Sequence, residues 1–155
     1  MDFGGRYLFG SKRTAVWAAL NDVRVLKAVI PGCERIEWTA ADALELTIRV
    51  NFGIVQPVFS GDLTLSDVHP AEAYLLSGRG RGGMLGLAHG AARIALSDAP
   101  DGGTLLSFTA EGKADGGIMR LGKALIGKSA QKVIDAFFES IGREMGSIVT
   151  ALPPV

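Results

Sequence analysis

The sequence predicts an α+β protein in which a curved antiparallel sheet of about seven strands packs against one long C-terminal helix. Two patterns indicate this. Between residues 35 and 111, apolar and polar residues alternate, as they do in half-buried strands. After Gly117, apolar residues recur every three or four positions, as in an amphipathic helix. The segments between the strands are too short for helical crossovers, so the strands are expected to be antiparallel.

The N-terminal part is expected to contain one strand and two short helices. Residues 3–9 form a short β-like stretch. Ser11 is the expected N-cap of the first helix, and either Asn21 or Asp22 can cap the second. The second helix should stop at Pro31–Gly32, because proline disfavours helix for the residue before it and glycine adopts left-handed geometry freely.

The alternating part of the chain contains the central strands. Its segments are 44–52, 59–65, 73–78, 85–96 and 104–110. Between the last two, residues 98–103 read DAPDGG, which is typical of a hairpin turn. In segment 85–96 the even-numbered residues are expected to look toward the helix, and His89 and Arg93 are expected on the outer face.

The last expected element is a helix of roughly 30 residues, about 45 Å long. Gly127 and Gly142 are expected to bend or weaken it. Its apolar stripe consists of Ile118, Leu121, Leu125, Ser129, Val133, Phe137, Ile141, Met145 and Ile148. A long helix that lies across a curved sheet leaves an internal apolar cavity between the two, so a cavity is expected here.

Length and composition indicate one globular domain over residues 1–150, with a short tail at 151–155. Sixteen basic residues balance sixteen acidic ones, which argues against nucleic acid as a partner. Cys33 is the single cysteine, so no internal disulfide forms and a reducing compartment fits. No apolar run approaches the ~18 residues of a transmembrane helix, and no signal peptide is evident. A cytoplasmic protein is therefore expected.

Two stretches match nucleotide-binding motifs by letter. Residues 122–129 read GKALIGKS and satisfy G-x-x-x-x-G-K-[ST], and residues 78–83 read GRGRGG and satisfy G-x-G-x-x-G. A phosphate-binding loop lies between a strand and a helix, whereas the first match lies inside the helical pattern. The dinucleotide fingerprint must open a helix, whereas the second match precedes a strand. Both matches are interpreted as coincidences.

Catalytic and metal-binding residues are not evident. Cys33 has no histidine nearby in the sequence to act as its base, so it is interpreted as a buried structural thiol. His69 lies in a turn before a proline and has no second ligand at metal spacing, and His89 is interpreted as a surface residue. No catalytic residue and no metal site is therefore predicted.

Small residues on one face of segment 85–96 are the most informative feature. Strand positions that face a core normally carry large branched side chains, so small ones leave room for a close helix or for a hydrophobic ligand. Both interpretations stay open. The candidate ligand-lining residues are Phe52, Phe59, Gly86, Ala88, Gly90, Phe108, Leu121, Leu125 and Phe137. Arg79 and Arg81 are the candidate contacts for an anion or a partner protein.

Four stretches of the chain resemble the family of carbon monoxide dehydrogenase G subunits, which belongs to the START-like (SRPBCC) superfamily. They are VWAALNDVRVLKAVIPGCERIE (16–37), FSGDLTL (59–65), SGRGRGGMLGLAHGAARIAL (77–96) and DGGIMRLGKALIGKSAQKVIDAFF (115–138). They follow the family's order over almost the whole chain, and the run I-P-G-C-E is fairly specific. The resemblance implies the helix-grip fold, in which a curved antiparallel sheet wraps around the long C-terminal helix.

The resemblance also implies a function. It is that of a non-catalytic accessory protein of a molybdenum hydroxylase, which binds a quinone or lipid in its cavity and helps recruit the enzyme to the membrane. Longer members carry an apolar C-terminal segment that this sequence lacks, so membrane contact is expected to be peripheral. Two alternatives remain: a START-like enzyme of the cyclase or hydratase type, and a purely structural assembly factor. The enzyme would need a polar pair in the cavity, such as Tyr74 with a carboxylate.

Overall fold

The computed structural model describes residues 2–49, 54, 56–82, 86–114 and 123–153, and within them the chain forms eight strands and three helices. In chain order these are β1 (Asp2–Phe9), α1 (Arg13–Leu20), α2 (Val23–Val29), β2 (Cys33–Ala40), β3 (Ala43–Arg49), β4 (Val58–His69), β5 (Ala73–Arg81), β6 (Leu87–Asp98), β7 (Thr104–Ala114), α3 (Lys123–Met145) and β8 (Val149–Ala151). The expected order of strand, two short helices, central strands and long helix is confirmed.

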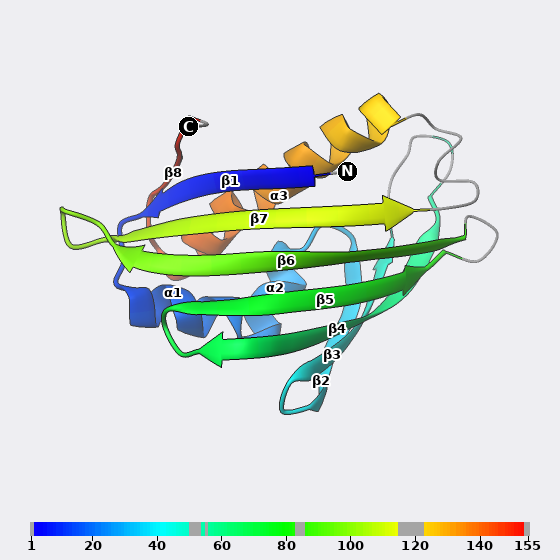
Figure 1. Cartoon of the computed structure of the whole chain (residues 1–155), viewed down its shortest axis with the longest axis horizontal. Helices are drawn as coiled ribbons and strands as arrows, with labels where there is room; N and C mark the ends of the chain where they lie inside the picture. Colours follow the sequence, from blue (N-terminus) through cyan, green and yellow to red (C-terminus); the bar gives the residue numbers. More distant parts are fainter. Residues whose placement is uncertain (1, 50–53, 55, 83–85, 115–122, 154–155) are drawn as a thin grey trace.

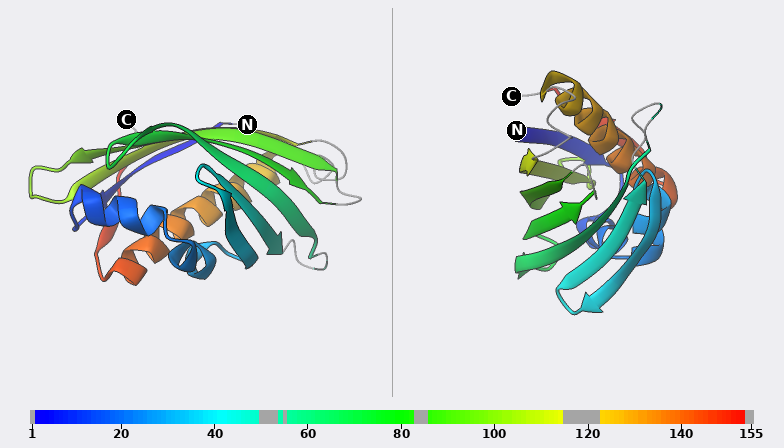
Figure 2. Two further views of the ribbon diagram at one scale, coloured as in Figure 1. Left: turned by 90° about the horizontal axis from the view of Figure 1, so that it is seen from below. Right: turned by 90° about the vertical axis from the view of Figure 1, so that its right-hand side faces the viewer.

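All eight strands form one antiparallel sheet in the order β2-β3-β4-β5-β6-β7-β1-β8 (Figure 1). Strands β2 to β7 follow one another as a meander, and β1 is added beyond β7. The sheet arches over the three helices, with α3 running diagonally beneath it (Figure 2). This curved sheet around a C-terminal helix is the helix-grip fold.

The eighth strand is not expected from the sequence. Residues 149–151 leave the end of α3 and pair with β1, with Tyr7 opposite Ala151. Three residues are too few for an alternating pattern to be recognised, so only the pairing with β1 identifies this strand.

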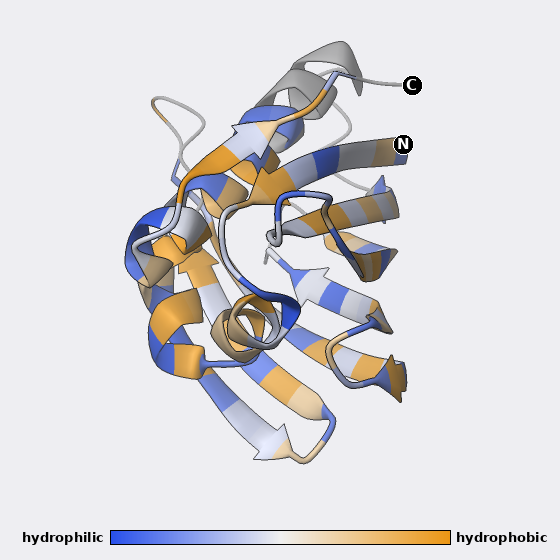
Figure 3. Cartoon of the chain, turned by 90° about the vertical axis from the view of Figure 1, so that its left-hand side faces the viewer, coloured by the Kyte–Doolittle hydropathy of each residue, from blue (hydrophilic) through white to orange (hydrophobic). Residues whose placement is uncertain are grey.

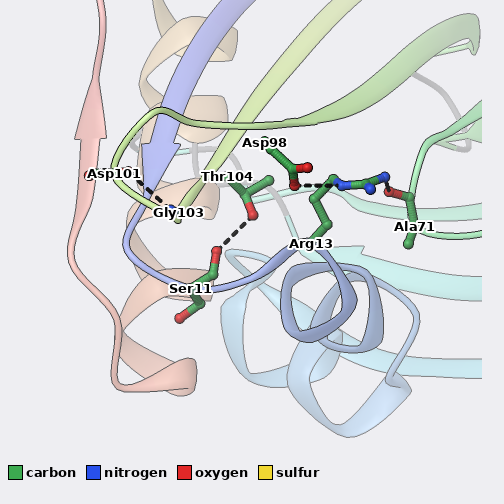
Figure 4. A network of polar contacts seen from close by, with 7 residues as sticks. All are labelled: Ser11, Arg13, Ala71, Asp98, Asp101, Gly103 and Thr104. Carbon is green, nitrogen blue, oxygen red and sulfur yellow. Dashed lines mark hydrogen bonds and ion pairs between the residues drawn. The ribbon is translucent and has the colours of Figure 1, made fainter.

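The two short helices begin and end as the sequence predicts, with one exception. The Asp22 carboxylate accepts a hydrogen bond from the Arg24 backbone N–H at 2.9 Å and caps α2. Gly32 ends the turn after α2 with φ +74°, and a Cβ there would overlap the Arg49 carbonyl. Ser11, however, is not the cap of α1. Lys12 occupies that position without a side-chain bond, and the Ser11 carbonyl instead accepts a bond from the Thr104 hydroxyl at 2.7 Å (Figure 4).

Helix α3 runs without interruption over Gly127 and Gly142 and ends earlier than expected, at Met145. Ile148 lies beyond the helix and is 81% exposed, and Val133 is 47% exposed, so the predicted stripe is wrong at both residues. The face that packs on the core is rotated slightly from the predicted stripe. It contains Ile134, Phe137, Phe138, Ile141 and Met145.

Gly142 allows the chain to return closely along α3. The Ser147 N–H donates to the Gly142 carbonyl at 2.8 Å, and a Cβ on Gly142 would overlap the Val149 side chain. The expectation that Gly142 bends or weakens the helix is therefore replaced by a packing role: the missing side chain makes room for β8.

The core lies between the inner face of the sheet, α1, α2 and the described C-terminal part of α3. Apolar and polar residues alternate along the strands (Figure 3). Successive side chains of a strand point to opposite faces, so one face of the sheet is apolar. The largest fully buried side chains are Tyr7, Phe9, Leu106, Ile141, Val16 and Thr104.

Candidate functional site

The inner face of the sheet changes from large to small side chains along the strands. Cross-strand register groups these side chains into four successive rows on β5, β6, β7 and β1. The rows are, in order, Leu96, Leu106 and Tyr7; Tyr74, Ile94, Phe108 and Gly5; Leu76, Ala92, Ala110 and Phe3; and Gly78, Gly90 and Gly112. Successive rows are two residues apart, or about 7 Å along a strand. The side chains thus become progressively smaller toward the end of the inner face that carries the three glycines.

The expected parity of residues 85–96 is confirmed. Ile94 and Leu96 are buried and Ala88, Gly90 and Ala92 half-buried on the inner face, whereas His89 and Arg93 are exposed on the outer face. Gly86 lies just before β6 with φ +93°, where its carbonyl accepts a hydrogen bond from the Gly82 N–H at 3.0 Å.

Two of the predicted aromatic residues contact the same third aromatic residue. Phe108 on β7 and Phe137 on α3 both contact Phe138, with ring centroids 5.6 Å and 5.0 Å apart respectively. Phe138 is buried but is absent from the predicted stripe, because helical spacing selects its neighbour Phe137.

The remaining predicted lining residues are not brought into this cluster. Phe59 lies on β4, where its ring covers Gly82 so closely that a Cβ on that glycine would overlap it. Phe52 and Leu121 lie outside the described residues, and Leu125 is described only as part of the α3 backbone.

As far as the structure describes its side chains, the inner face is almost free of charge. Among the described residues the buried polar side chain, besides the tyrosines, is that of Thr104, and no Lys, Arg or His is buried. The carboxylate that contacts a side chain of this face is Asp135 on α3, and Glu139 also lies near Tyr7. A ligand on this face would therefore meet mainly hydrocarbon.

Tyr7 connects the sheet to α3. Its hydroxyl donates to Asp135 Oδ1 at 2.5 Å, and the Gln131 amide donates to the same oxygen at 3.1 Å. Burial, together with the hydrogen bond to Asp135, raises the pKa of Tyr7 well above its usual value. Its ring packs on Phe138 with centroids 4.5 Å apart. The tyrosine–carboxylate pair in this protein is thus formed by Tyr7, from strand β1, and not by Tyr74.

Tyr74 is the second tyrosine of the inner face. It is 5% exposed, and its ring meets Trp17 of α1 edge to face at 5.2 Å. Burial alone raises the pKa of Tyr74, and no described residue forms a hydrogen bond with its hydroxyl.

The predicted contact residues Arg79 and Arg81 lie on the opposite, outer face of β5 and are exposed. Arg79 is in register with His89 on β6, which is in register with Lys113 on β7. No ion pair within 4 Å involves these side chains among the described residues. They face solvent, and on the other side of Arg79 the same row continues to Asp62 on β4.

A separate polar network fixes the end of the sheet that carries the largest inner side chains (Figure 4). Arg13 Nε donates to Asp98 Oδ1 at 2.8 Å, and Arg13 Nη1 donates to the Ala71 carbonyl at 2.9 Å. A surface depression of about 300 Å³ lies beside these residues. Because its polar groups already satisfy one another, we interpret this network as structural.

The nucleotide motifs do not form nucleotide sites. Residues 123–129 of the first match are part of α3, and residues 78–81 of the second are part of β5. Cys33 is half-buried, and burial raises the pKa of its thiol, which disfavours a nucleophilic thiolate. In the described part of the chain no group of His, Cys, Asp and Glu side chains could hold a metal.

The chain is similar to known proteins in sequence and in fold. The family model of the carbon monoxide dehydrogenase G subunit (CoxG) matches residues 5–146. A conserved protein from Geobacillus kaustophilus superimposes with a TM-score of 0.86 at 23% identity, over 96% of this chain and 99% of that chain. The Zhui aromatase/cyclase from a Streptomyces species superimposes with a TM-score of 0.67 at 12% identity, over 94% and 93%.

A protein from Thermus thermophilus has the same TM-score of 0.67 at 14% identity, over 94% of this chain and 97% of that chain. These likenesses show that the fold is START-like. No curated protein sequence matches the chain. No helix in the described ranges is long and apolar enough to cross a bilayer.

Proposed function

The chain belongs to the CoxG family of carbon monoxide dehydrogenase G subunits, and we propose that it is a non-catalytic accessory protein that holds an apolar small molecule against the inner face of its sheet. The observation that carries this proposal is the gradation of the inner face. Three glycines in register, Gly78, Gly90 and Gly112, occupy positions where a filled core would carry branched side chains. An uncharged surface made of glycine and alanine residues suits a hydrocarbon-rich ligand.

We propose that this ligand is a quinone or a lipid and that the partner is a molybdenum hydroxylase of the carbon monoxide dehydrogenase type. The family supports the partner, and the apolar inner face supports the ligand. A quinone would accept the two electrons that oxidation of carbon monoxide releases. A protein that shields a quinone from water could bring it to such an enzyme.

We propose that recruitment to the membrane is peripheral and uses the outer face of β5 to β7. Arg79, His89 and Lys113 align there beside Asp62 of β4, and Arg81 lies two residues further along β5. Exposed basic side chains are attracted to anionic lipid head groups, each by about 1 kcal/mol near the surface. Sedimentation with phosphatidylglycerol vesicles should fall when Arg79 and Arg81 are changed to Ser. Unchanged sedimentation would remove this face from the proposal.

The first test of the ligand is native mass spectrometry with lipid extraction, on protein purified from its own host. A co-purifying quinone or other apolar molecule supports the carrier function. The co-purified molecule should then be transferred between this protein and a hydroxylase that the protein captures in a pull-down. Protein that is repeatedly free of ligand, and that takes up no added quinone, would contradict it.

The placement of the ligand can be tested by filling the small-residue end. Gly90 is unsuitable, because a Cβ there would lie 2.7 Å from the Glu111 carbonyl oxygen on the neighbouring strand. Gly80 lies on the same inner face, and among the described residues a Cβ there would meet nothing closer than the Ser60 carbonyl at 3.9 Å. Gly80→Leu should weaken binding of decylubiquinone at least tenfold while the thermal midpoint stays equal or rises.

The matched control is Ser77→Leu, which adds the same side chain on the outer face of β5. It should leave decylubiquinone affinity unchanged. If Gly80→Leu binds as tightly as the wild type, the ligand does not occupy the inner face.

An enzyme of the cyclase type is the second candidate, because Tyr7 and Asp135 form a tyrosine–carboxylate pair. Two observations favour a structural role for the pair: Tyr7 is 1% exposed, and its hydroxyl already donates a hydrogen bond to Asp135. Turnover of a polyketide-like substrate that disappears in Asp135→Asn would favour the enzyme. A purely structural assembly factor is favoured if neither ligand nor turnover is found while the hydroxylase is still captured.

A further inference from the structure

The two tyrosines of the chain are both buried on the inner face, but only one hydroxyl has a partner among the described residues. The Tyr7 hydroxyl donates to Asp135 at 2.5 Å. The Tyr74 hydroxyl forms no hydrogen bond with any described residue. Buried polar groups in native proteins nearly always have a partner, so an unpaired phenol in the interior calls for an explanation.

The Tyr74 side chain is held in place on the inner face. It is 5% exposed, and its hydroxyl has no partner among the described residues. The ring is held from the side by Trp17, with centroids 5.2 Å apart, and this contact fixes where the hydroxyl points.

Tyr74 stands at the inner end of the small-residue region. Its own row contains Ile94 and Phe108, and the next two rows toward the glycine-rich end contain Ala92 and then Gly90. The Gly90 row lies about 14 Å along the strand from the Tyr74 row. A molecule that covers the Ala92 and Gly90 rows with its hydrocarbon part would bring its inner end to the Tyr74 hydroxyl.

We propose that Tyr74 is the residue that recognises the polar head of the ligand, by donating a hydrogen bond to a neutral carbonyl oxygen. This inference rests on the proposed ligand-binding function and specifies the chemical class of the ligand. The phenol acts as a donor, since burial keeps it protonated over the physiological range.

A carboxylate head is disfavoured at the same place. No Lys, Arg or His is buried among the described residues to compensate its charge, and the carboxylate near the inner face, Asp135, would repel it. The geometry therefore selects quinones, ketones and esters over free fatty acids.

The test compares two ligands of the same shape in the full chain. One is a decyl-substituted naphthoquinone, and the other is the decyl-substituted naphthalene without the carbonyl oxygens. Tyr74→Phe should weaken quinone binding about fivefold to tenfold, as expected for one neutral hydrogen bond, and leave naphthalene binding unchanged in calorimetric titrations. Dodecanoate should bind the wild type more weakly than the quinone.

Tyr7→Phe is the matched control. It removes a phenol oxygen from the same face, but one that is already bonded to Asp135, so quinone affinity should not change. Equal quinone affinity of wild type and Tyr74→Phe would overturn the role of Tyr74 and leave the carrier function intact. Failure of the wild type to bind either ligand would overturn both.

A second measurement does not depend on the variant being folded. The infrared carbonyl band of the quinone bound to wild-type protein should shift to lower wavenumber relative to the quinone in hexane, because a hydrogen bond weakens the C=O bond. A band at the hexane position would contradict the proposal.

Discussion

At the scale of single residues, the two tyrosines show that identical buried side chains have different roles when their hydrogen-bond partners differ. The Tyr7 hydroxyl joins β1 to α3 through Asp135, 128 positions away in the sequence. The Tyr74 hydroxyl forms no hydrogen bond with a described residue and so joins no two elements of the fold. The same substitution should therefore have opposite consequences at the two positions.

Tyr7→Phe should lower the free energy of unfolding by about 1–3 kcal/mol, since it removes a hydrogen bond to a partly buried carboxylate. Tyr74→Phe should leave the free energy of unfolding unchanged or slightly higher, because it removes an unpaired polar atom. Urea unfolding of both variants measures the difference. A loss at Tyr74 as large as that at Tyr7 would indicate a hydrogen bond within the apo protein.

The sequence predicts residues well where one local rule decides the outcome. Asp22 is expected to cap a helix because a short acceptor side chain before an apolar-periodic segment bonds to the free N–H groups, and it does. Ser11 satisfies the same rule and does not cap, because α1 begins one residue later and Lys12 occupies the N-cap position. The Tyr7–Asp135 pair escapes sequence reasoning because its two members are 128 positions apart in the sequence.

At the scale of elements, alternation and helical spacing identify each long strand and each helix but not their fine limits. Strand β6 has the predicted inner and outer faces because one face is buried and a one-residue slip would expose it. Helix α3 ends earlier than predicted, since Ile148 continues the spacing although the chain has already turned at Gly146, with φ +68°. The spacing of apolar residues alone does not show where a helix stops.

Gly142 provides the test at this scale. Gly142→Ala would normally stabilise a helix interior by up to about 1 kcal/mol. Here it should instead destabilise the protein, because the added methyl group overlaps Val149 and displaces β8 from β1. Thermal unfolding compares this variant with the double variant Gly142→Ala, Val149→Ala, in which the overlap is relieved. A higher midpoint for the single variant would show that β8 is not held against α3.

At the scale of the whole molecule, the fold class and strand order can be expected from the sequence and the family, whereas the site can be predicted only in outline. Small residues on one strand indicate room for a close helix or for a ligand. That glycines from three strands stand in register, as Gly78, Gly90 and Gly112 do, depends on pairings that no local pattern specifies. The register of these glycines cannot be read from any one strand, because sheet register is a property of several strands together.

Alkaline titration tests the interior as a whole, because both tyrosines of the chain are buried in it. Their pKa values are raised in the folded protein, so below about pH 10 the folded and unfolded chains are equally protonated at these groups. Above that pH the unfolded chain loses phenolic protons that the folded chain keeps. Stability should fall by up to about 1.4 kcal/mol per pH unit for each tyrosine.

Absorbance at the tyrosinate band should accordingly appear together with loss of far-ultraviolet circular dichroism, in one transition. Tyr74→Phe should reduce the pH dependence of unfolding by about half. Tyrosinate that forms well before the secondary structure is lost would show that one of the phenols reaches solvent in the folded protein.

The position of β1 in the sheet has a consequence for synthesis on the ribosome. This strand leaves the exit tunnel before the other strands of the sheet, yet its two neighbours are β7 and β8, which are translated about 100 residues later or more. Until then its apolar residues, Tyr7 and Phe9 among them, have no strand to lie beside. We therefore expect the nascent chain to remain a client of holding chaperones for most of its translation, and to complete its sheet in a late, cooperative step.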